Sequence, residues 1–287
     1  MTALRQRMCE NMQLRGLAAR TQESYLAAVR QLAVHYGRSP DQLSDEELRQ
    51  YFLYLRNEKR VAPNTSTVAL NAVKFLYVHT LQRPWPLRDL LRPPIPQKLP
   101  VVLAPEAIWR IIAQVRRPDY RVCLSVIAAC GLRLLEGVRL QVTQIDSPRM
   151  QLLIRGGKGN KDRAVPLPAR TLSLLRAHWR LHRNPTWLFP GAVAPGEQHA
   201  SRPMEESALQ KAFRKAVQAA GVSKPATIHS LRHSWATELL ESGVSVRVLQ
   251  LWMGHTSPTT TAIYTHLTRK AEVQATLALD QLTAGMP

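Results

Sequence analysis

A dense run of prolines divides this chain more sharply than any other feature of its sequence. Each proline fixes φ and lacks a backbone N–H, so a helix cannot continue through such a run and an extended, semi-rigid connector is favoured. We therefore predict two domains, residues 1–83 and 103–287, joined by a linker at 84–102. Six prolines fall within 17 residues of the 287-residue chain: Pro84, Pro86, Pro93, Pro94, Pro96 and Pro100.

The segment before the prolines has the pattern of a small helical bundle. Ser44 and Glu47 form a capping-box pattern, with Leu43 and Leu48 placed as a hydrophobic staple, and Gly37 suits a helix stop. Apolar residues recur at helical spacing in three stretches: Tyr25, Val29, Leu32 and Tyr36; Leu48, Tyr51, Phe52 and Leu55; and, after Pro63-Asn64, Val68, Ala72, Phe75 and Leu76.

The segment after the prolines mixes helices with a short hairpin. We expect a helix start at Ala104-Pro105-Glu106 and a buried helix over Val122 to Leu132. Two short strands, 150–155 and 163–167, flank a glycine-rich turn. The whole chain is thus predicted to be mainly α with a small antiparallel β-sheet. Further helices are expected at 169–182, 205–220, 229–242 (stopped at Gly243) and 245–253.

The charge of the chain points to a polyanionic partner. Lys and Arg total 39 against 20 Asp and Glu, giving a net charge of +19 and a pI near 10.7. A compact chain this basic repels itself, and Lys and Arg displace the counterions condensed on phosphates, so nucleic acid is the leading partner.

No apolar run reaches the ~18 residues that span a membrane. Cys123 and Cys130 lie in an apolar stretch without CxxC spacing, which predicts buried thiols in a soluble, cytoplasmic protein.

Four segments carry candidate chemistry, although each has an ordinary explanation when taken alone. In GLRLLE, Arg133 follows an apolar helix and must meet either Glu136 or a ligand anion. In GKGNKDR, Lys158 lies on a glycine-rich turn that lacks P-loop spacing and could equally be a solvated basic turn. In HSLRHSWAT, His229 and Arg232 share a helix face.

The fourth segment, LWMGHTS followed by YTH, offers His255 and Tyr264. A single tyrosine is most often a packing residue. His229 and His233 are also four residues apart, as in a zinc-binding helix. That motif needs Glu directly after the first His, and here the residue is Ser230, so we predict no metal site.

Together these motifs resemble the tyrosine recombinases, the phage-integrase-like enzymes. The resemblance also covers the N-terminal helices, which are similar to the family's core-binding domain. In its N-terminal half and linker the chain is most similar to integron-type and transposon-associated members. Only 71 positions separate Lys158 from His229, too few for the extra helix of integron integrases. Departures are Trp252-Met253 where Leu is usual before Gly-His, and Leu135 where Ser is common. Matching positions occur in the family's order: Arg133, Lys158, His229, Arg232, His255 and Tyr264.

The resemblance implies DNA strand cleavage and joining through a 3′-phosphotyrosyl link made by Tyr264, with no metal, ATP or other cofactor. It implies that Arg133 and Arg232 clamp the phosphate, Lys158 protonates the leaving oxygen, and His229 accepts the tyrosine proton. His255 would donate a hydrogen bond to the phosphate, and Glu136 would orient a neighbouring Arg or His.

The partner implied is double-stranded DNA with inverted half-sites, bound by a homodimer on each site and a homotetramer in synapsis. Two other functions remain open: a catalytically silent DNA-binding regulator of the same fold, and DNA relaxation like that of type IB topoisomerases. A metal-dependent nuclease using His229 and His233 is a third. Basic residues of the linker and hairpin are expected to contact DNA: Arg83, Arg88, Arg92, Lys98, Lys161 and Arg163.

Overall fold

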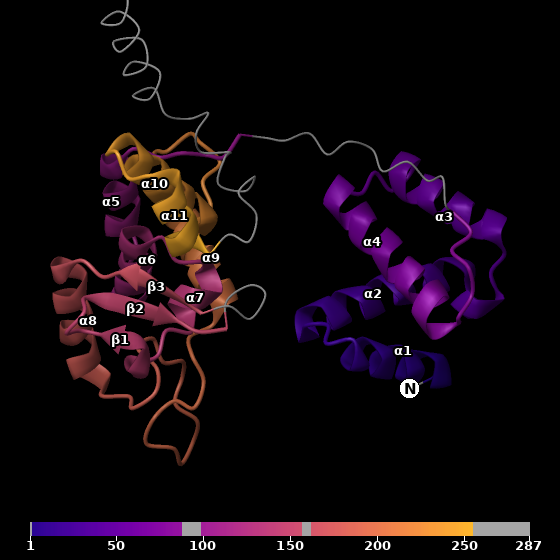
Figure 1. Cartoon of the computed structure of the whole chain (residues 1–287), viewed down its shortest axis with the longest axis horizontal. Coiled ribbons are helices and arrows are strands. Elements are labelled where there is room, and N and C mark those ends of the chain that lie inside the picture. Colours follow the sequence, from indigo (N-terminus) through magenta and orange to yellow (C-terminus); the bar gives the residue numbers. More distant parts are fainter. Residues whose placement is uncertain (1, 88–98, 157–161, 255–287) are drawn as a thin grey trace, which may run out of the picture. The chain divides into compact units, whose positions relative to one another are not determined.

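The computed structural model describes residues 2–87, 99–156 and 162–254. The chain divides into two compact units, Met1–Lys98 and Leu99–Pro287 (Figure 1). Most of the predicted linker, residues 88–98, lies outside the described residues. Within the described ranges, no helix combines the length and apolarity needed to cross a bilayer.

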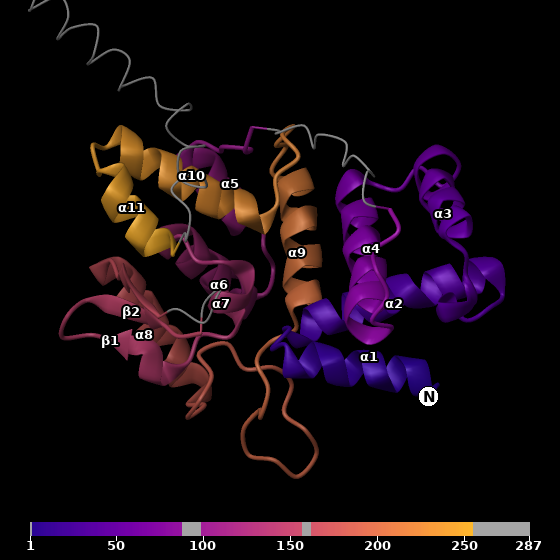
Figure 2. The same cartoon turned by 45° about the vertical axis from the view of Figure 1, so that its right-hand side comes forward.

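The described part of the N-terminal unit consists of helices joined by short loops. Helix α2 packs against α4, and α1 packs against the π-helical turn Leu76–Thr80 that extends α4. Both views of the molecule show the four helices gathered around one interior (Figures 1 and 2). The helices are α1 (Ala3–Leu14), α2 (Ala19–Tyr36), α3 (Asp45–Asn57) and α4 (Pro63–Phe75).

The sequence signals for these helices are confirmed in detail. Gly37 adopts the left-handed conformation that ends α2. The Glu47 N–H donates to the Ser44 hydroxyl, and the Ser44 N–H donates to the Glu47 carboxylate at 2.8 Å, which completes the capping box. Val68 differs from the predicted apolar set, because it is 38% exposed. The buried face of α4 runs instead through Ala69, Ala72 and Val73.

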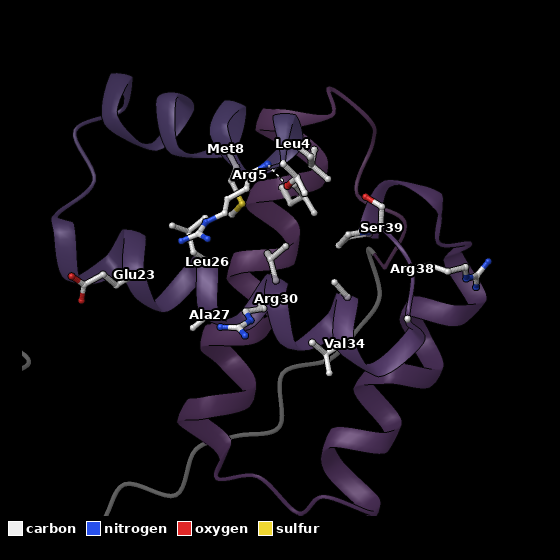
Figure 3. A pocket seen from close by; sticks show the side chains of 16 residues that line it. Leu4, Arg5, Met8, Glu23, Leu26, Ala27, Arg30, Val34, Arg38 and Ser39 are labelled. Atoms are coloured by element: carbon white, nitrogen blue, oxygen red, sulfur yellow. Dashed lines mark hydrogen bonds between the residues drawn. The ribbon is translucent and has the colours of Figure 1, made fainter.

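A hollow of about 700 Å³ opens on the surface of this unit, lined mainly by side chains of α1 and α2. Leu4 and Met8 of α1 and Leu26 of α2 contribute apolar walls, while Glu23 and Arg38 stand at its opposite ends (Figure 3). Its lining residues all belong to the N-terminal unit and include none of the candidate catalytic or DNA-contacting residues.

The C-terminal unit is built around α6 (Pro118–Cys130), the predicted buried helix. Helix α6 packs against α5, α7, α8 and α10. Cys123 and Cys130 are buried in it, as predicted, and burial raises the pKa of the Cys130 thiol to about 12. The other helices are α5 (Pro105–Ala113), α7 (Leu134–Val138), α8 (Ala169–His182), α9 (Glu206–Ala219), α10 (Ile228–Glu241) and α11 (Val246–Met253).

A three-stranded antiparallel sheet completes this unit, in the order β1-β2-β3. The predicted hairpin is confirmed: β2 (Gln151–Ile154) pairs with β3 (Arg163–Pro166). Strand β1 (Ile145–Asp146) was not predicted, because two residues are too few to show alternation. Figures 1 and 2 agree in placing the sheet and α8 at one end of the unit and α5 and α10 at the other, with α6 between. Helix α11 contacts both α10 and β3.

Candidate active site in the C-terminal unit

A tight turn after α6 positions Arg133. Gly131 ends α6 with φ +59°, and a Cβ at this position would lie 2.3 Å from the Trp235 ring of α10. Only glycine fits there, because any other residue would meet both the left-handed backbone penalty and the indole. The chain then turns into α7 with Arg133 at its N-cap, 25% exposed on its side chain.

Helix α10 brings Arg232 to the same place from another part of the chain. The side chain of Arg232 is 1% exposed. Its Nη1 donates to the Gly131 carbonyl at 2.7 Å, and its Nη2 donates to the Met253 carbonyl at 2.5 Å. Arg133 Nη2 donates to that same Met253 carbonyl at 3.2 Å. Two arginines separated by 99 positions thus converge on one carbonyl oxygen at the end of α11.

Glu136 lies between the arginines of this cluster. Its Oε1 accepts from Arg133 Nη1 at 2.8 Å, and its Oε2 accepts from the Arg133 backbone N–H at 2.7 Å. Both oxygens also accept from Arg163 Nη1 and Nη2, at 2.8 and 2.6 Å. Arg232 Nη1 lies 3.9 Å from Oε2. The carboxylate therefore orients arginines from three separate segments.

The ionic surroundings fix the charge of Glu136. Burial alone would raise the pKa of its carboxyl. The hydrogen bonds and charge of Arg163, followed by the amide and guanidinium of Arg133, outweigh burial and lower the pKa to about 2. Glu136 is therefore ionised at neutral pH and acts here as a hydrogen-bond acceptor rather than as an acid.

His229 supplies the titratable group at this site. It lies in the first turn of α10 with an exposed face, and desolvation, then Arg232, then Arg133 lower the pKa of its imidazole. The ring packs edge-on against His233, with centroids 4.4 Å apart. Desolvation, then His229 and Arg232, lower the pKa of His233 to about 4. Both imidazoles are therefore mainly neutral at pH 7, which leaves a ring nitrogen of His229 able to accept a proton.

Arg163, expected to contact DNA, occupies an internal position instead, and that expectation is corrected. Its side chain is 7% exposed. Besides the two bonds to Glu136, its Nε donates to the Trp252 carbonyl at 2.7 Å. The GKGNKDR motif does not distinguish a buried basic residue from an exposed one, and Arg163, the first residue of β3, meets a fixed protein partner in Glu136.

The comparisons with known proteins match both units of the chain. Residues 102–271 match the phage integrase family, and residues 4–87 match the N-terminal SAM-like domain of phage integrases. A putative integrase/recombinase of Sinorhizobium fredii, y4qK, is 44% identical over 265 residues, which cover 92% of this chain and 84% of that protein.

The chain belongs to the phage integrase family of tyrosine recombinases. Tyrosine recombinase XerA of Thermococcus onnurineus is 32% identical over 197 residues, covering 66% of this chain and 68% of that one. The fold is that of a solved lambda integrase dimer bound to a core site, with a TM-score of 0.71 at 16% identity over 92% of this chain and 94% of that chain.

The structure of this recombinase thus gathers Arg133, Arg163 and Arg232 around Glu136, and His229 lies close enough to Arg232 and Arg133 for their charges to lower its pKa. The remaining predicted catalytic residues, Lys158, His255 and Tyr264, lie outside the described residues. So do the basic residues Arg88, Arg92, Lys98 and Lys161. Arg83 is described and exposed, and it donates to the Asp41 carbonyl at 2.7 Å. Among the residues that the structure places, no three His, Cys, Asp or Glu side chains gather as a metal site.

Sequence reasoning missed the supports of this recombinase's site. Trp235 Nε1 donates to the Ala129 carbonyl at 3.1 Å and its ring covers Gly131, so it fixes the turn that carries Arg133. The carbonyls of Trp252, Met253 and Gly254 were missed as well, although the Met-Gly stop of α11 hinted at an exposed helix end. Every residue carries a backbone carbonyl, so the sequence does not show which carbonyls accept these hydrogen bonds, and only the fold does.

Proposed function

We propose that this recombinase cleaves and rejoins DNA through a covalent bond between Tyr264 and a 3′-phosphate. The phenol oxygen of Tyr264 attacks the phosphorus, and the bond from phosphorus to the 5′-oxygen breaks. The 5′-hydroxyl of a partner strand then attacks the phosphotyrosyl link and restores the phenol. Because each step exchanges one phosphate ester for another, the bond energy is retained and ATP is not needed.

One observation carries this proposal: Arg133 and Arg232 meet at the Met253 carbonyl, which lies two positions before His255 and eleven before Tyr264. Two fixed guanidiniums can stabilise the negative charge that grows on the nonbridging oxygens of the phosphate. That is the work a metal ion performs in other phosphoryl-transfer sites, so we propose a metal-free reaction.

Proton transfer is assigned to two further residues. The neutral His229 accepts the phenol proton, a role supported by its lowered pKa and its place beside Arg232. Lys158 delivers a proton to the departing 5′-oxygen, and His255 donates a hydrogen bond to the phosphate. Arg133 is partly exposed in the structure, whereas Arg232 is covered, so contact between Arg232 and the phosphate requires the groups over its guanidinium to move.

A nicked duplex that traps the covalent product tests the assignment. Wild-type protein is expected to form a protein–DNA adduct that survives denaturation, and Tyr264→Phe is expected to bind the same duplex without forming one. Arg133→Ala should lower the cleavage rate by on the order of 10²–10³-fold while lowering affinity far less. An adduct formed at full rate by Tyr264→Phe refutes the nucleophile.

The same assay separates the competing functions. A silent regulator gives binding and no adduct with any duplex. A metal-dependent nuclease loses activity in EDTA, whereas this reaction continues. A topoisomerase-like enzyme relaxes supercoils as a monomer without site preference, whereas we propose a dimer on each pair of inverted half-sites and a tetramer in synapsis, measurable by the mass of the complexes.

The basic linker and hairpin residues are proposed to bind the DNA backbone. Arg83, Arg88, Arg92, Lys98 and Lys161 would neutralise phosphates, a role supported by the net charge of +19. Each phosphate contact removed should flatten the dependence of log affinity on log salt by about one. Alanine at these positions with an unchanged salt slope argues against the contact.

A further inference from the structure

Arg163 donates three hydrogen bonds within the cluster, yet nothing in the proposed reaction uses it. Three of its N–H groups donate to fixed acceptors: two to the Glu136 carboxylate, at 2.8 and 2.6 Å, and one to the Trp252 carbonyl, at 2.7 Å. Its side chain is 7% exposed and that of Glu136 is 10% exposed. A planar fork held this way is a rigid connection, which a flexible lysine ammonium cannot reproduce.

The backbone of Gly254 packs directly on the Arg163 side chain. Gly254 ends α11 with φ +60°, and a Cβ built there would lie 2.8 Å from Arg163 Cδ and 3.4 Å from its Nε and Nη1. The last carbonyls of a helix have no partner within the helix. Here all three carbonyls accept from guanidinium groups. Trp252 accepts from Arg163 and Gly254 accepts from Arg133. Met253 accepts from both Arg232 and Arg133.

Arg163 also joins the three segments that hold the proposed catalytic residues. It is the first residue of β3 and follows Lys158 by five positions. Through Trp252 and Gly254 it touches the end of the helix that directly precedes His255. Through Glu136 it reaches Arg133.

The charges around Glu136 give Arg163 a second effect. The charged groups that face this carboxylate among the described residues are Arg133, Arg163 and Arg232. With Arg163 present, one carboxylate and three guanidiniums sum to a net charge of +2; without it the sum is +1. The buried carboxylate would then be compensated only by the two arginines that the phosphate needs.

We propose that Arg163 is a positioning residue for this reaction: it holds Glu136 and the end of α11 so that Arg133 and Arg232 keep their geometry and their positive charge for the scissile phosphate. The inference rests on the proposed function and adds a residue to it. Arg163 itself touches neither the phosphate nor the tyrosine. It acts through the carboxylate and the carbonyl that it binds.

Single-turnover cleavage of the nicked duplex, measured over a range of DNA concentrations, separates positioning from binding. Arg163→Met should lower the maximal rate by on the order of 10- to 100-fold, as loss of an orienting partner does at other sites, while the half-saturating DNA concentration changes little. Arg163→Lys keeps the charge but not the fork, so its rate should fall between the two. The matched control is Arg149→Met in the turn between β1 and β2. The Arg149 side chain is 79% exposed, and the rate of this variant should equal that of the wild type.

Two readouts would not respond to a merely structural role. Adding Glu136→Gln to Arg163→Met removes the uncompensated carboxylate and should restore part of the lost rate, a positive coupling in the double-mutant cycle. In Arg163→Met alone, Glu136 should take up a proton at a higher pH than in the wild type. The rate of this variant relative to the wild type should therefore rise as the pH falls from 7 to 5.

The outcomes distinguish this inference from the function beneath it. If the wild type forms no adduct, the proposed function fails. If the wild type forms the adduct and Arg163→Met matches its maximal rate, or if the rate loss appears wholly as weaker DNA binding, the positioning role is overturned alone. Should Arg163→Met not fold, Arg163→Lys decides: a reduced maximal rate at unchanged affinity supports the role, and a wild-type rate overturns it.

Discussion

The two units of this recombinase use the same pair of residue types in opposite ways. In the N-terminal unit, Glu47 binds Arg38 with side chains 31% and 47% exposed, at the start of α3. In the C-terminal unit, Glu136 binds Arg163 with side chains 10% and 7% exposed, and two more arginines face the same carboxylate. The first pair stands in water and the second is removed from it.

This difference in burial decides what each pair does. An exposed ion pair is screened by solvent and contributes little to stability, so the N-terminal unit depends on its apolar core. A buried charge must be compensated and hydrogen-bonded, which makes every member of the Glu136 cluster depend on the others. The cluster fixes the positions of its arginines because each charge needs the others, whereas loss of the surface pair should affect the fold little.

The sharpest way to break this comparison is to remove both carboxylates in turn. Glu136→Ala leaves Arg163 buried beside two like charges and should destabilise the C-terminal unit by about 3–5 kcal/mol. Glu47→Ala should change the stability of the N-terminal unit far less. Hydrogen exchange on the full chain resolves the two units, which a single melting curve does not. Similar losses of protection in the two variants would show that burial is not the deciding factor.

Two glycines extend the comparison to the backbone. Gly37 and Gly131 both end a helix in the left-handed conformation, but a Cβ at Gly37 meets nothing within 4 Å, whereas one at Gly131 meets Trp235 at 2.3 Å. Gly37→Ala should therefore cost about 1–2 kcal/mol, from the backbone alone. Gly131→Ala adds overpacking and should cost about 2–5 kcal/mol.

Gly131→Ala should also slow cleavage, because the Gly131 carbonyl accepts a hydrogen bond from Arg232. Hydrogen exchange measures the stabilities and the nicked duplex measures the rate. Gly37→Ala is the matched control and should leave the rate unchanged. Equal stability losses at the two glycines would contradict the close approach of Trp235.

Much of this arrangement was accessible from the sequence. Helical periodicity and capping signals placed α3 and α8 within a residue or two of their observed bounds and the end of α2 at Gly37, because each helix buries one regular face. The hairpin followed from the glycines between two apolar runs. The arginine of GLRLLE was expected to meet either Glu136 or an anion, and the structure shows the contact with Glu136.

The inward role of Arg163 could not be predicted in the same way. Its partners lie 27 and 89 positions away, at Glu136 and Trp252, and one of them is a backbone carbonyl. Local pattern identifies a basic residue near a basic turn and therefore favours solvent or DNA. Whether an arginine is buried depends on tertiary partners that cannot be predicted from the residues next to it in the sequence.

Acid should unfold the C-terminal unit before the N-terminal unit, because the titrating groups of the two units differ in burial. In the C-terminal unit, desolvation first lowers the pKa values of His178, His182 and His233, the last to about 4. Each unfolded imidazole takes up a proton near pH 6.5, so stability falls as the pH drops below 6.5 toward the folded values. In the N-terminal unit His79 shows the same direction of pKa shift, but it stands alone.

A second loss in the C-terminal unit should follow from Glu136. Its pKa is about 2 in the folded protein against 4.5 ordinarily, so it contributes about 3 kcal/mol above pH 4.5, lost as the pH falls from 4.5 toward 2. Hydrogen exchange over a pH series, corrected for intrinsic rates, should show the C-terminal unit opening first. Glu136→Gln should lack the second loss. Simultaneous opening of both units would contradict the asymmetry.

The smallest effect concerns the exposed cap of α3. Ser44→Ala removes the hydroxyl that accepts from the Glu47 N–H and should cost about 1 kcal/mol, confined to hydrogen exchange in the N-terminal unit. Ser44→Asp keeps an acceptor at the N-cap and should restore most of the loss. Neither variant should alter the cleavage rate of a bound duplex, because the described members of the Glu136 cluster all belong to the C-terminal unit. A slower cleavage step in Ser44→Ala, at saturating DNA, would mean that exposed polar contacts of the helical unit also affect the reaction. That result would contradict the assignment of the chemistry to the buried Glu136 cluster alone.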